Sequence, residues 1–211
     1  MPRSLGSDFV RRPPAPPGGG WDGDGGRSDW GASRRASFTG LLVLVAATTM
    51  VFAALTSAYV IRRGISGDWS ATPLPPVVWA NTAVLLVSSA LLEAARACLR
   101  AGRRTAFNAW WTAATAAGVL FLLGQGVVWR ELREAGYYLA GNPSSSFFYL
   151  LTAAHAIHLL GGIAALVYVV VRALGFALGP ARRTAADISA LFWHFLNGVW
   201  IYLLLLFSFY S

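Results

Sequence analysis

Residues 146–171 read SFFYLLTAAHAIHLLGGIAALVYVVV, a run that contains no aspartate, glutamate, lysine or arginine. The run exceeds the roughly 20 apolar residues that an α-helix needs to cross about 30 Å of hydrocarbon. A membrane-spanning strand is excluded, because barrel strands alternate apolar and polar residues and an open sheet edge in lipid leaves its backbone unsatisfied. The run therefore predicts a transmembrane helix.

Four further runs of the same kind predict helices over about residues 37–61, 77–99, 107–129 and 188–209. The composition agrees, since 56% of the 211 residues are hydrophobic and 12% are charged, whereas a soluble domain carries about 25% charged residues. So few charges cannot cover a water-facing surface, which excludes an ordinary cytosolic enzyme. We predict an all-α membrane protein with five transmembrane helices in a domain of residues 37–211.

Residues 1–36 form a separate segment by composition. They contain eight glycines and five prolines, and PPAPPGGG stands at 13–20. We find no helical or strand periodicity in this stretch, which predicts a flexible Pro/Gly-rich tail. Four aspartates interrupt its arginines, which argues against a nucleic-acid-binding arm.

The arginines predict an orientation in the membrane. Thirteen of the 17 cationic residues lie in the tail and in the segments that join helix 2 to helix 3 and helix 4 to helix 5. With five crossings these three segments share one side, and four arginines remain on the other. By the positive-inside rule the N-terminus is cytoplasmic and the C-terminus is outside. The net charge of +8 is then mostly a topology signal, so we expect no nucleic-acid partner.

The three histidines are the first candidates for chemistry inside the bilayer. His155 and His158 are spaced i, i+3 and share a helix face, while His194 lies near the start of the last helix. Such imidazoles could ligate a metal or a haem in a stand-alone membrane anchor, or they could bond across helices or to lipid headgroups. The lack of a neighbouring carboxylate in the sequence favours the second interpretation, and so we expect no metal site.

Other polar residues in the helices offer no catalytic constellation. Glu93 and Arg96 are three residues apart, so they form an interfacial ion pair or, in the alternative, part of a proton path. Gln125 lies between Gly124 and Gly126, where helix backbones can approach and its amide can bond a neighbouring helix. The single cysteine excludes an internal disulfide and a cysteine-based metal site. We find no pairing of nucleophile and base, so we expect no catalytic residue.

Two stretches resemble sequence motifs of one known family. FFYLLTAAHAIHLLGG at 147–162 and WHFLNGVW at 193–200 resemble the FY..TG.HG.H..GG and WHFVD.VW motifs of subunit III of haem–copper oxidases. Ala58, Tyr59 and Arg62 resemble the AY..R end of the family's glutamate-bearing helix, and residues 81–86 resemble its NT..LL helix start. The resemblance runs from about residue 37 to the C-terminus, in the order that the family has.

The resemblance implies the short, five-helix form of cytochrome c oxidase subunit III, in a bacterial-type cytoplasmic membrane. It implies a non-catalytic subunit of a respiratory oxidase that reduces O2 to water and pumps protons. The subunit would support assembly, bind phospholipid and sustain proton uptake, with subunit I as its main contact and subunit II in the same complex. Haem and copper would belong to those partners. The same subunit in a quinol oxidase remains the alternative.

The resemblance also implies roles for individual residues. It makes packing or lipid-contact residues of Tyr59, Arg62, Gln125, His155, His158, Trp193 and His194. Two positions depart from the family, since its buried glutamate falls on Thr48 and the aspartate of its closing motif is Asn197. Both substitutions remove an ionisable group and keep a hydrogen-bonding one.

Overall fold

The five predicted helices are present in a computed structural model of the chain. The structure describes residues 25–139 except 66, 68, 70 and 71, and also residues 141–174 and 180–210. All five helices are long and apolar enough to cross a membrane. Their bounds are α1 Gly25–Ile65, α2 Val77–Arg100, α3 Arg104–Glu134, α4 Pro143–Leu174 and α5 Pro180–Tyr210.

Several helices extend beyond their apolar runs, which corrects the boundaries expected from the sequence. The first begins at Gly25 rather than near residue 37, so residues 25–36 of the expected tail are helical; residues 1–24 lie outside the described part. The last begins at Pro180, eight residues before its apolar run. Hydropathy locates only the part of a helix that lies in hydrocarbon, whereas alanine and arginine in the adjoining polar segments also favour helix.

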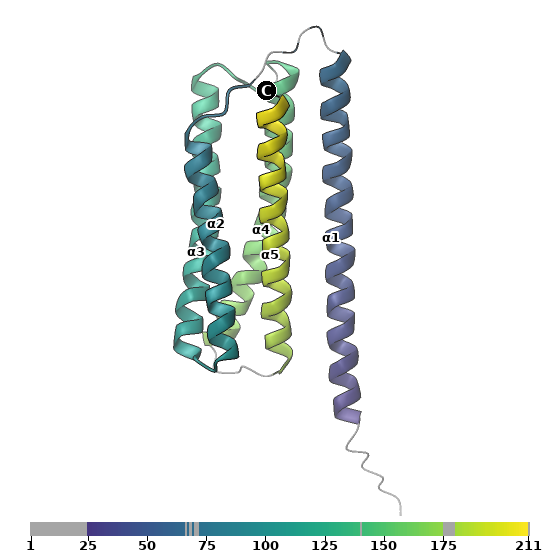
Figure 1. Cartoon of the computed structure of the whole chain (residues 1–211), viewed down its shortest axis with the longest axis vertical. Coiled ribbons are helices and arrows are strands. Elements are labelled where there is room, and N and C mark those ends of the chain that lie inside the picture. The colour runs from purple at the N-terminus through teal and green to yellow at the C-terminus, as the bar shows by residue number, and fades with distance from the viewer. Residues whose placement is uncertain are drawn as a thin grey trace, which may run out of the picture.

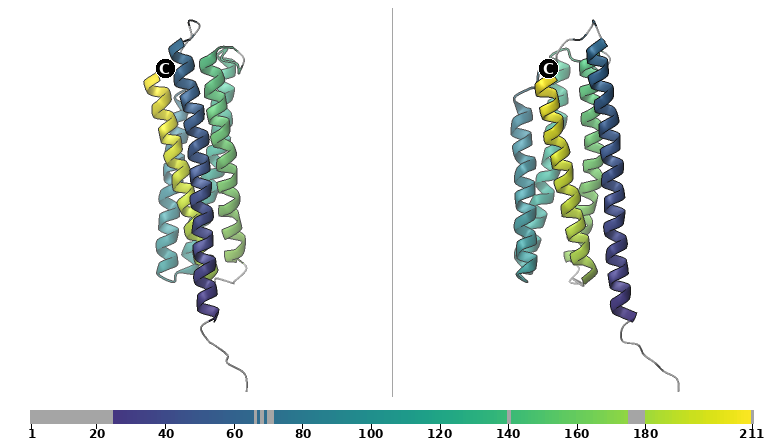
Figure 2. Two further views of the ribbon diagram at one scale, coloured as in Figure 1. Left: turned by 90° about the vertical axis from the view of Figure 1, so that its right-hand side faces the viewer. Right: turned by 45° about the vertical axis from the view of Figure 1, so that its right-hand side comes forward.

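The helices run up and down and divide into three parts, as Figure 1 shows. Helices α2 and α3 form one hairpin, α4 and α5 pair beside it, and α1 stands on the far side of α4 and α5 (Figure 2). Within the described residues, α1 contacts only these last two helices. The helices also differ in burial: 17% of the most apolar stretch of α1 is buried, compared with 56% of that of α5. Helix α5 is therefore the central element and α1 an outer one.

Glycines end the two helices of the hairpin. Gly102 (φ +72°) follows α2 and Gly136 (φ +87°) follows α3, both in the left-handed region. After each glycine the chain bonds back into the last helical turn, from Arg103 N to the Cys98 carbonyl at 2.9 Å and from Tyr137 N to the Leu132 carbonyl at 2.9 Å. These are Schellman caps, which satisfy orphan carbonyls and turn the chain sharply.

Buried tryptophans fill the core and bond across it. The indole of Trp111 on α3 donates to the Leu166 carbonyl of α4 at 3.1 Å, and that of Trp200 on α5 donates to the Thr82 hydroxyl of α2 at 3.0 Å. In lipid such bonds and close packing, rather than water exclusion, hold helices together. The core thus joins the hairpin to the α4–α5 pair.

Candidate functional site: the histidine core and the α2–α5 cluster

Tyr59 lies in an aromatic box where α1 meets the ends of α4 and α5. Its buried ring makes edge-on contacts with Trp69 at 5.2 Å, Phe147 of α4 at 5.7 Å and Phe207 of α5 at 6.0 Å between ring centroids. Arg62 follows in the last turn of the same helix and is half-buried. Edge-to-face geometry is the favoured one for aromatic pairs, so this box attaches α1 to the rest of the bundle.

His155 lies at the centre of the bundle, with 1% of its surface exposed. Its ring is 5.1 Å from Trp200 of α5, 6.2 Å from Phe121 of α3 and 6.4 Å from Phe52 of α1, between centroids. Neither ring nitrogen meets a hydrogen-bond partner among the described residues. Four helices thus enclose an imidazole that packs as an aromatic ring.

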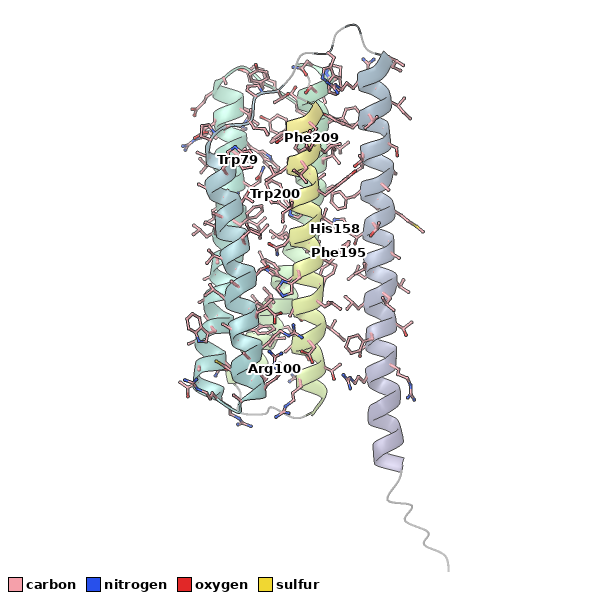
Figure 3. All side chains as sticks on the ribbon, in the orientation of Figure 1. Trp79, Arg100, His158, Phe195, Trp200 and Phe209 are labelled. Carbon is pink, nitrogen blue, oxygen red and sulfur yellow. The ribbon has the colours of Figure 1, made fainter. Side chains whose placement is uncertain are left out.

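His158 shares with His155 the contact with α1, as their spacing predicts. Its ring is 5.5 Å from Phe52 and is half-buried. Figure 3 labels His158 on the side of the α4–α5 pair that faces α1. Its Nδ1 lies 2.8 Å from the Ala154 carbonyl of its own helix, and because a carbonyl can only accept, Nδ1 donates. The bond fixes the ring against α1.

Thr48 and Asn197, where the resemblance implies carboxylates in the family, are both buried. The Thr48 hydroxyl has no partner among the described residues. Asn197 donates from Nδ2 to the Trp193 carbonyl at 2.8 Å, while its Oδ1 meets no donor in the described part. Both side chains therefore lie in the bundle interior, where a neutral residue avoids the burial of a charge.

Gln125 does not form the interhelical bond that its flanking glycines suggest. It is buried, and neither amide atom finds a partner within the described residues. The interhelical bond at this point is made by α2 instead. Asn81 of α2 packs against Gly124 and donates from Nδ2 to the Phe121 carbonyl at 3.1 Å. The close contact occurs at Gly124, whereas a Cβ at Gly126 would meet nothing within 4 Å, and the amide that bonds across it belongs to α2.

Trp193 fills a pocket that two glycines leave open. A Cβ added at Gly118 of α3 would lie 2.5 Å from its ring, and one added at Gly162 of α4 would lie 3.2 Å from it. The side chain itself is fully buried. Gly118 and Gly162 therefore leave the space that this indole occupies between α3 and α4.

A second polar group, which we name the α2–α5 cluster, comprises Ser89, Glu93, Arg96, Asp187 and His194. His194 Nε2 lies 2.8 Å from Glu93 Oε1 and its Nδ1 lies 3.1 Å from the Ser89 hydroxyl. A carboxylate can only accept, so Nε2 donates to Glu93, and a neutral ring then accepts from Ser89 at Nδ1. Both ring nitrogens are used in binding α2.

Arg96 of α2 connects Glu93 to Asp187 of α5 within the α2–α5 cluster. Its Nη1 donates to Glu93 Oε1 at 2.6 Å, and its Nη2 and Nε donate to Asp187 Oδ1 at 3.0 and 3.2 Å. The expected pair of Glu93 and Arg96 therefore forms, as one link of a chain that crosses between the helices twice. Such a chain fixes both the spacing and the register of α2 and α5.

Sequence reasoning missed Asp187 and the bond from Glu93 to His194. One signal was present, because Asp187 precedes His194 by seven residues, two helical turns that place both on one face. Among the described residues no group of three or more histidine, cysteine, aspartate or glutamate side chains is arranged to hold a metal ion. The arrangement can join helices and move or hold a proton.

Comparison with known proteins identifies the family. The family model described as cytochrome c oxidase subunit III matches residues 34–211, which include all five membrane-spanning stretches. The chain belongs to this family. It is an integral membrane protein and a subunit III of a terminal oxidase, an oxidoreductase complex of several subunits.

Curated relatives cover most of the chain. The cytochrome c oxidase subunit 3 of Corynebacterium diphtheriae is 31% identical over 168 residues, which are 77% of this chain and 82% of that protein. That of Synechocystis is 30% identical over 177 residues, covering 79% and 72%. A probable cytochrome c oxidase subunit 3 of Nocardia farcinica is 28% identical over 166 residues, covering 77% and 82%.

Proposed function

We propose that the chain is a non-catalytic subunit that supports a haem- and copper-bearing core, with subunit I as its main contact and subunit II in the same complex. The observation that carries this proposal is the family match across all five helices. The interior supports it as well, because the buried histidine packs between aromatic rings and His194 bonds to α2. The reduction of O2 to water would then take place in the partner subunits.

The family-motif residues have structural tasks in this proposal. Trp193, His155 and Gln125 hold the interior together, and His194 links α5 to α2. Tyr59 and His158 hold α1 against the bundle, while the Arg62 guanidinium at the end of α1 binds a phospholipid phosphate. The placement of a half-buried arginine in the last turn of a membrane-spanning helix supports that lipid contact.

The subunit sits in the cytoplasmic membrane with its N-terminus inside, on this proposal. The distribution of arginines along the chain supports that orientation. The turn between α2 and α3, which holds Arg103 and Arg104, would face the cytoplasm. Since the family's two carboxylates are Thr48 and Asn197 here, the chain would sustain proton uptake through assembly of the complex rather than through those two sites.

Affinity purification of the tagged chain from solubilised membranes tests the proposal. We expect a partner with haem ligands to copurify, and the complex to reduce O2. A copper-binding domain in the copurified subunit II would indicate a cytochrome c oxidase, and its absence the quinol oxidase alternative. A Soret absorption band in the chain purified alone would contradict the proposal, because it would indicate a haem-binding anchor.

A further inference from the structure

His194 of α5 lies between a carboxylate and a hydroxyl of the neighbouring helix α2. Its Nε2 donates to Glu93 Oε1 at 2.8 Å, and its Nδ1 lies 3.1 Å from the Ser89 hydroxyl. While the ring is neutral, Nδ1 accepts from Ser89. Both contacts join α5 to α2, so the protonation state of this ring acts directly on the pairing of the two helices.

Both bonds of this ring are kept when it gains a proton. A protonated imidazole donates from both nitrogens, so Nε2 still donates to Glu93 while Nδ1 donates to the Ser89 oxygen. The Ser89 hydroxyl proton can then turn to a carbonyl of the preceding helical turn, as serine hydroxyls in helices do. The bond to Glu93 becomes one between two ions, and charge-assisted bonds are roughly twice as strong as neutral ones.

The charged groups around the imidazole belong to α2 and α5. Arg96 shares the Glu93 oxygen at 2.6 Å, and its positive charge opposes a second cation. Asp187 balances that charge, since it accepts from Arg96 at 3.0 and 3.2 Å. Exposed arginines lie nearer the end of each helix, Arg100 on α2 and Arg183 on α5. Charges that water surrounds are screened far more than a pair in contact, so the Glu93 carboxylate decides the local balance.

The other three helices bring no charged side chain to this contact along their apolar stretches. Residues 36–61 of α1, 105–129 of α3 and 144–171 of α4 contain no aspartate, glutamate, lysine or arginine. The two histidines of α4, His155 and His158, pack against α1 instead. Tyrosines in these stretches belong to a residue type that titrates near pH 10, far from the range in which imidazole changes charge. The protonation of His194 is therefore governed within the α2–α5 cluster.

The α2–α5 cluster is open to water at the polar end of α5. Asp187 precedes the apolar run that begins at residue 188, and the side chains of Asp187, Glu93 and His194 are 41%, 46% and 30% exposed. Hydrogen bonds connect Asp187 through Arg96 to Glu93 and the imidazole. Imidazole is the side chain that changes charge between pH 5 and 8, so this ring can exchange a proton with water in that range.

We infer that the α2–α5 cluster is a pH-sensitive latch, in which a proton on His194 tightens the pairing of α2 with α5. Uptake of one proton from water converts the neutral imidazole into an imidazolium, and no covalent bond between heavy atoms changes. The latch is stronger at pH 5.5 than at pH 8, because the bond to Glu93 is stronger when the ring is charged. On the proposed orientation this end of the bundle faces the cytoplasm, so the latch responds to cytoplasmic pH.

Thermal unfolding of the full chain in detergent at pH 5.5 and pH 8 tests the latch. His194→Gln keeps an uncharged donor toward Glu93 and cannot take up the proton. We expect the midpoint of the unaltered chain, relative to this variant, to be about 2–4 °C higher at pH 5.5 than at pH 8. His158→Gln is the control, because that ring bonds to its own helix, and its offset should be equal at both pH values. An equal offset for His194→Gln as well would overturn the inference.

The Glu93→Gln background gives a second test of the same latch. Without the carboxylate, a charged ring has no ionic partner across the helices. The difference between the chain with His194 and the chain with His194→Gln should then lose its dependence on pH. A difference that keeps this dependence would contradict the latch and would assign the response to another group.

Nitrogen-15 NMR of the ring-labelled, unaltered chain needs no variant that has to fold. Nδ1 of His194 should pass from an accepting nitrogen at pH 8 to a protonated one at pH 5.5, whereas Nδ1 of His158 donates at both. The absence of such a change from every histidine would rule the latch out. These measurements use the chain without its partner subunits, so their outcome is independent of the purification that tests the proposed function.

Discussion

In the core of this subunit, a glycine that contacts an aromatic ring leaves little room for a larger side chain. Gly118 leaves room for the indole of Trp193, and a Cβ there would lie 2.5 Å from it. We expect Gly118→Ala to destabilise the bundle by about 1–3 kcal/mol, as overpacking does. Gly126→Ala on the same helix, with nothing within 4 Å, should be neutral or slightly stabilising. The thermal unfolding midpoint in detergent compares the two, and equal midpoints would contradict the packing argument.

His155 permits a residue-scale test of its role. Because its ring packs against three aromatic residues and its nitrogens bond to no described residue, His155→Phe should keep the packing and remove two buried polar atoms. We expect stability to be unchanged or to rise by about 1–2 kcal/mol, whereas His155→Ala should lower it. The measurement is the unfolding midpoint together with the haem spectrum of the complex. A loss of haem absorbance in His155→Phe would contradict a packing role.

Whether a contact between two side chains can be predicted from the sequence depends on how many positions separate the two residues along the chain. The Glu93–Arg96 pair could be predicted because the two residues are three positions apart on one helix. The bond of Glu93 to His194 spans 101 positions, and no pattern within either helix determines which neighbour comes to lie opposite. Gln125 shows the same limit, since its glycines predicted a close approach but not that Asn81 would make the bond.

Among the five helices, α1 has the smallest buried share of its apolar stretch and contacts only α4 and α5 within the described residues. Phe52 attaches it at mid-membrane by packing against both histidines of α4. Phe52→Ala should therefore weaken the docking of α1 by about 3–5 kcal/mol. Met50→Ala, two residues earlier and 72% exposed, removes a comparable volume from the outer face and should change little. Protease susceptibility and the unfolding midpoint of the purified complex compare the two variants, and equal behaviour would contradict the assignment of Phe52 as an anchor.

The pairing of α2 with α5 makes a separate prediction. If Glu93 and His194 stabilise this pairing together, the effects of Glu93→Gln and His194→Gln on the free energy of unfolding should not add. We expect a coupling energy of about 0.5–1.5 kcal/mol in a double-mutant cycle. The pair of Glu93 with Arg130, which belong to different ends of the bundle, is the control and should be additive. A coupling near zero for Glu93 and His194 would mean that their contact at 2.8 Å contributes no stability.

For the whole molecule, the number and order of helices were predictable because they follow from backbone hydrogen bonding in lipid. A chain that crosses lipid must satisfy every backbone group within its own segment, so each apolar run of sufficient length becomes a helix. The polar ends of the helices lie outside that constraint. Hydropathy therefore missed residues 25–36 of α1 and residues 180–187 of α5. Asp187 lies in the second of these stretches, which is why the α2–α5 cluster was only half foreseen.

The orientation of the whole bundle is the remaining large-scale prediction, and the chain offers matched positions for it. Arg103 lies exposed in the turn after α2, and Glu134 lies exposed at the end of α3, at the opposite end of the bundle. In a Cys98→Ser background, we expect a membrane-impermeant maleimide to label Glu134→Cys in intact cells and Arg103→Cys only after lysis. The reason is that arginine-rich short loops stay on the cytoplasmic side during insertion. The reverse pattern would show that arginine content does not set this subunit's topology, and would place the carboxylates of the α2–α5 cluster toward the outer side of the membrane.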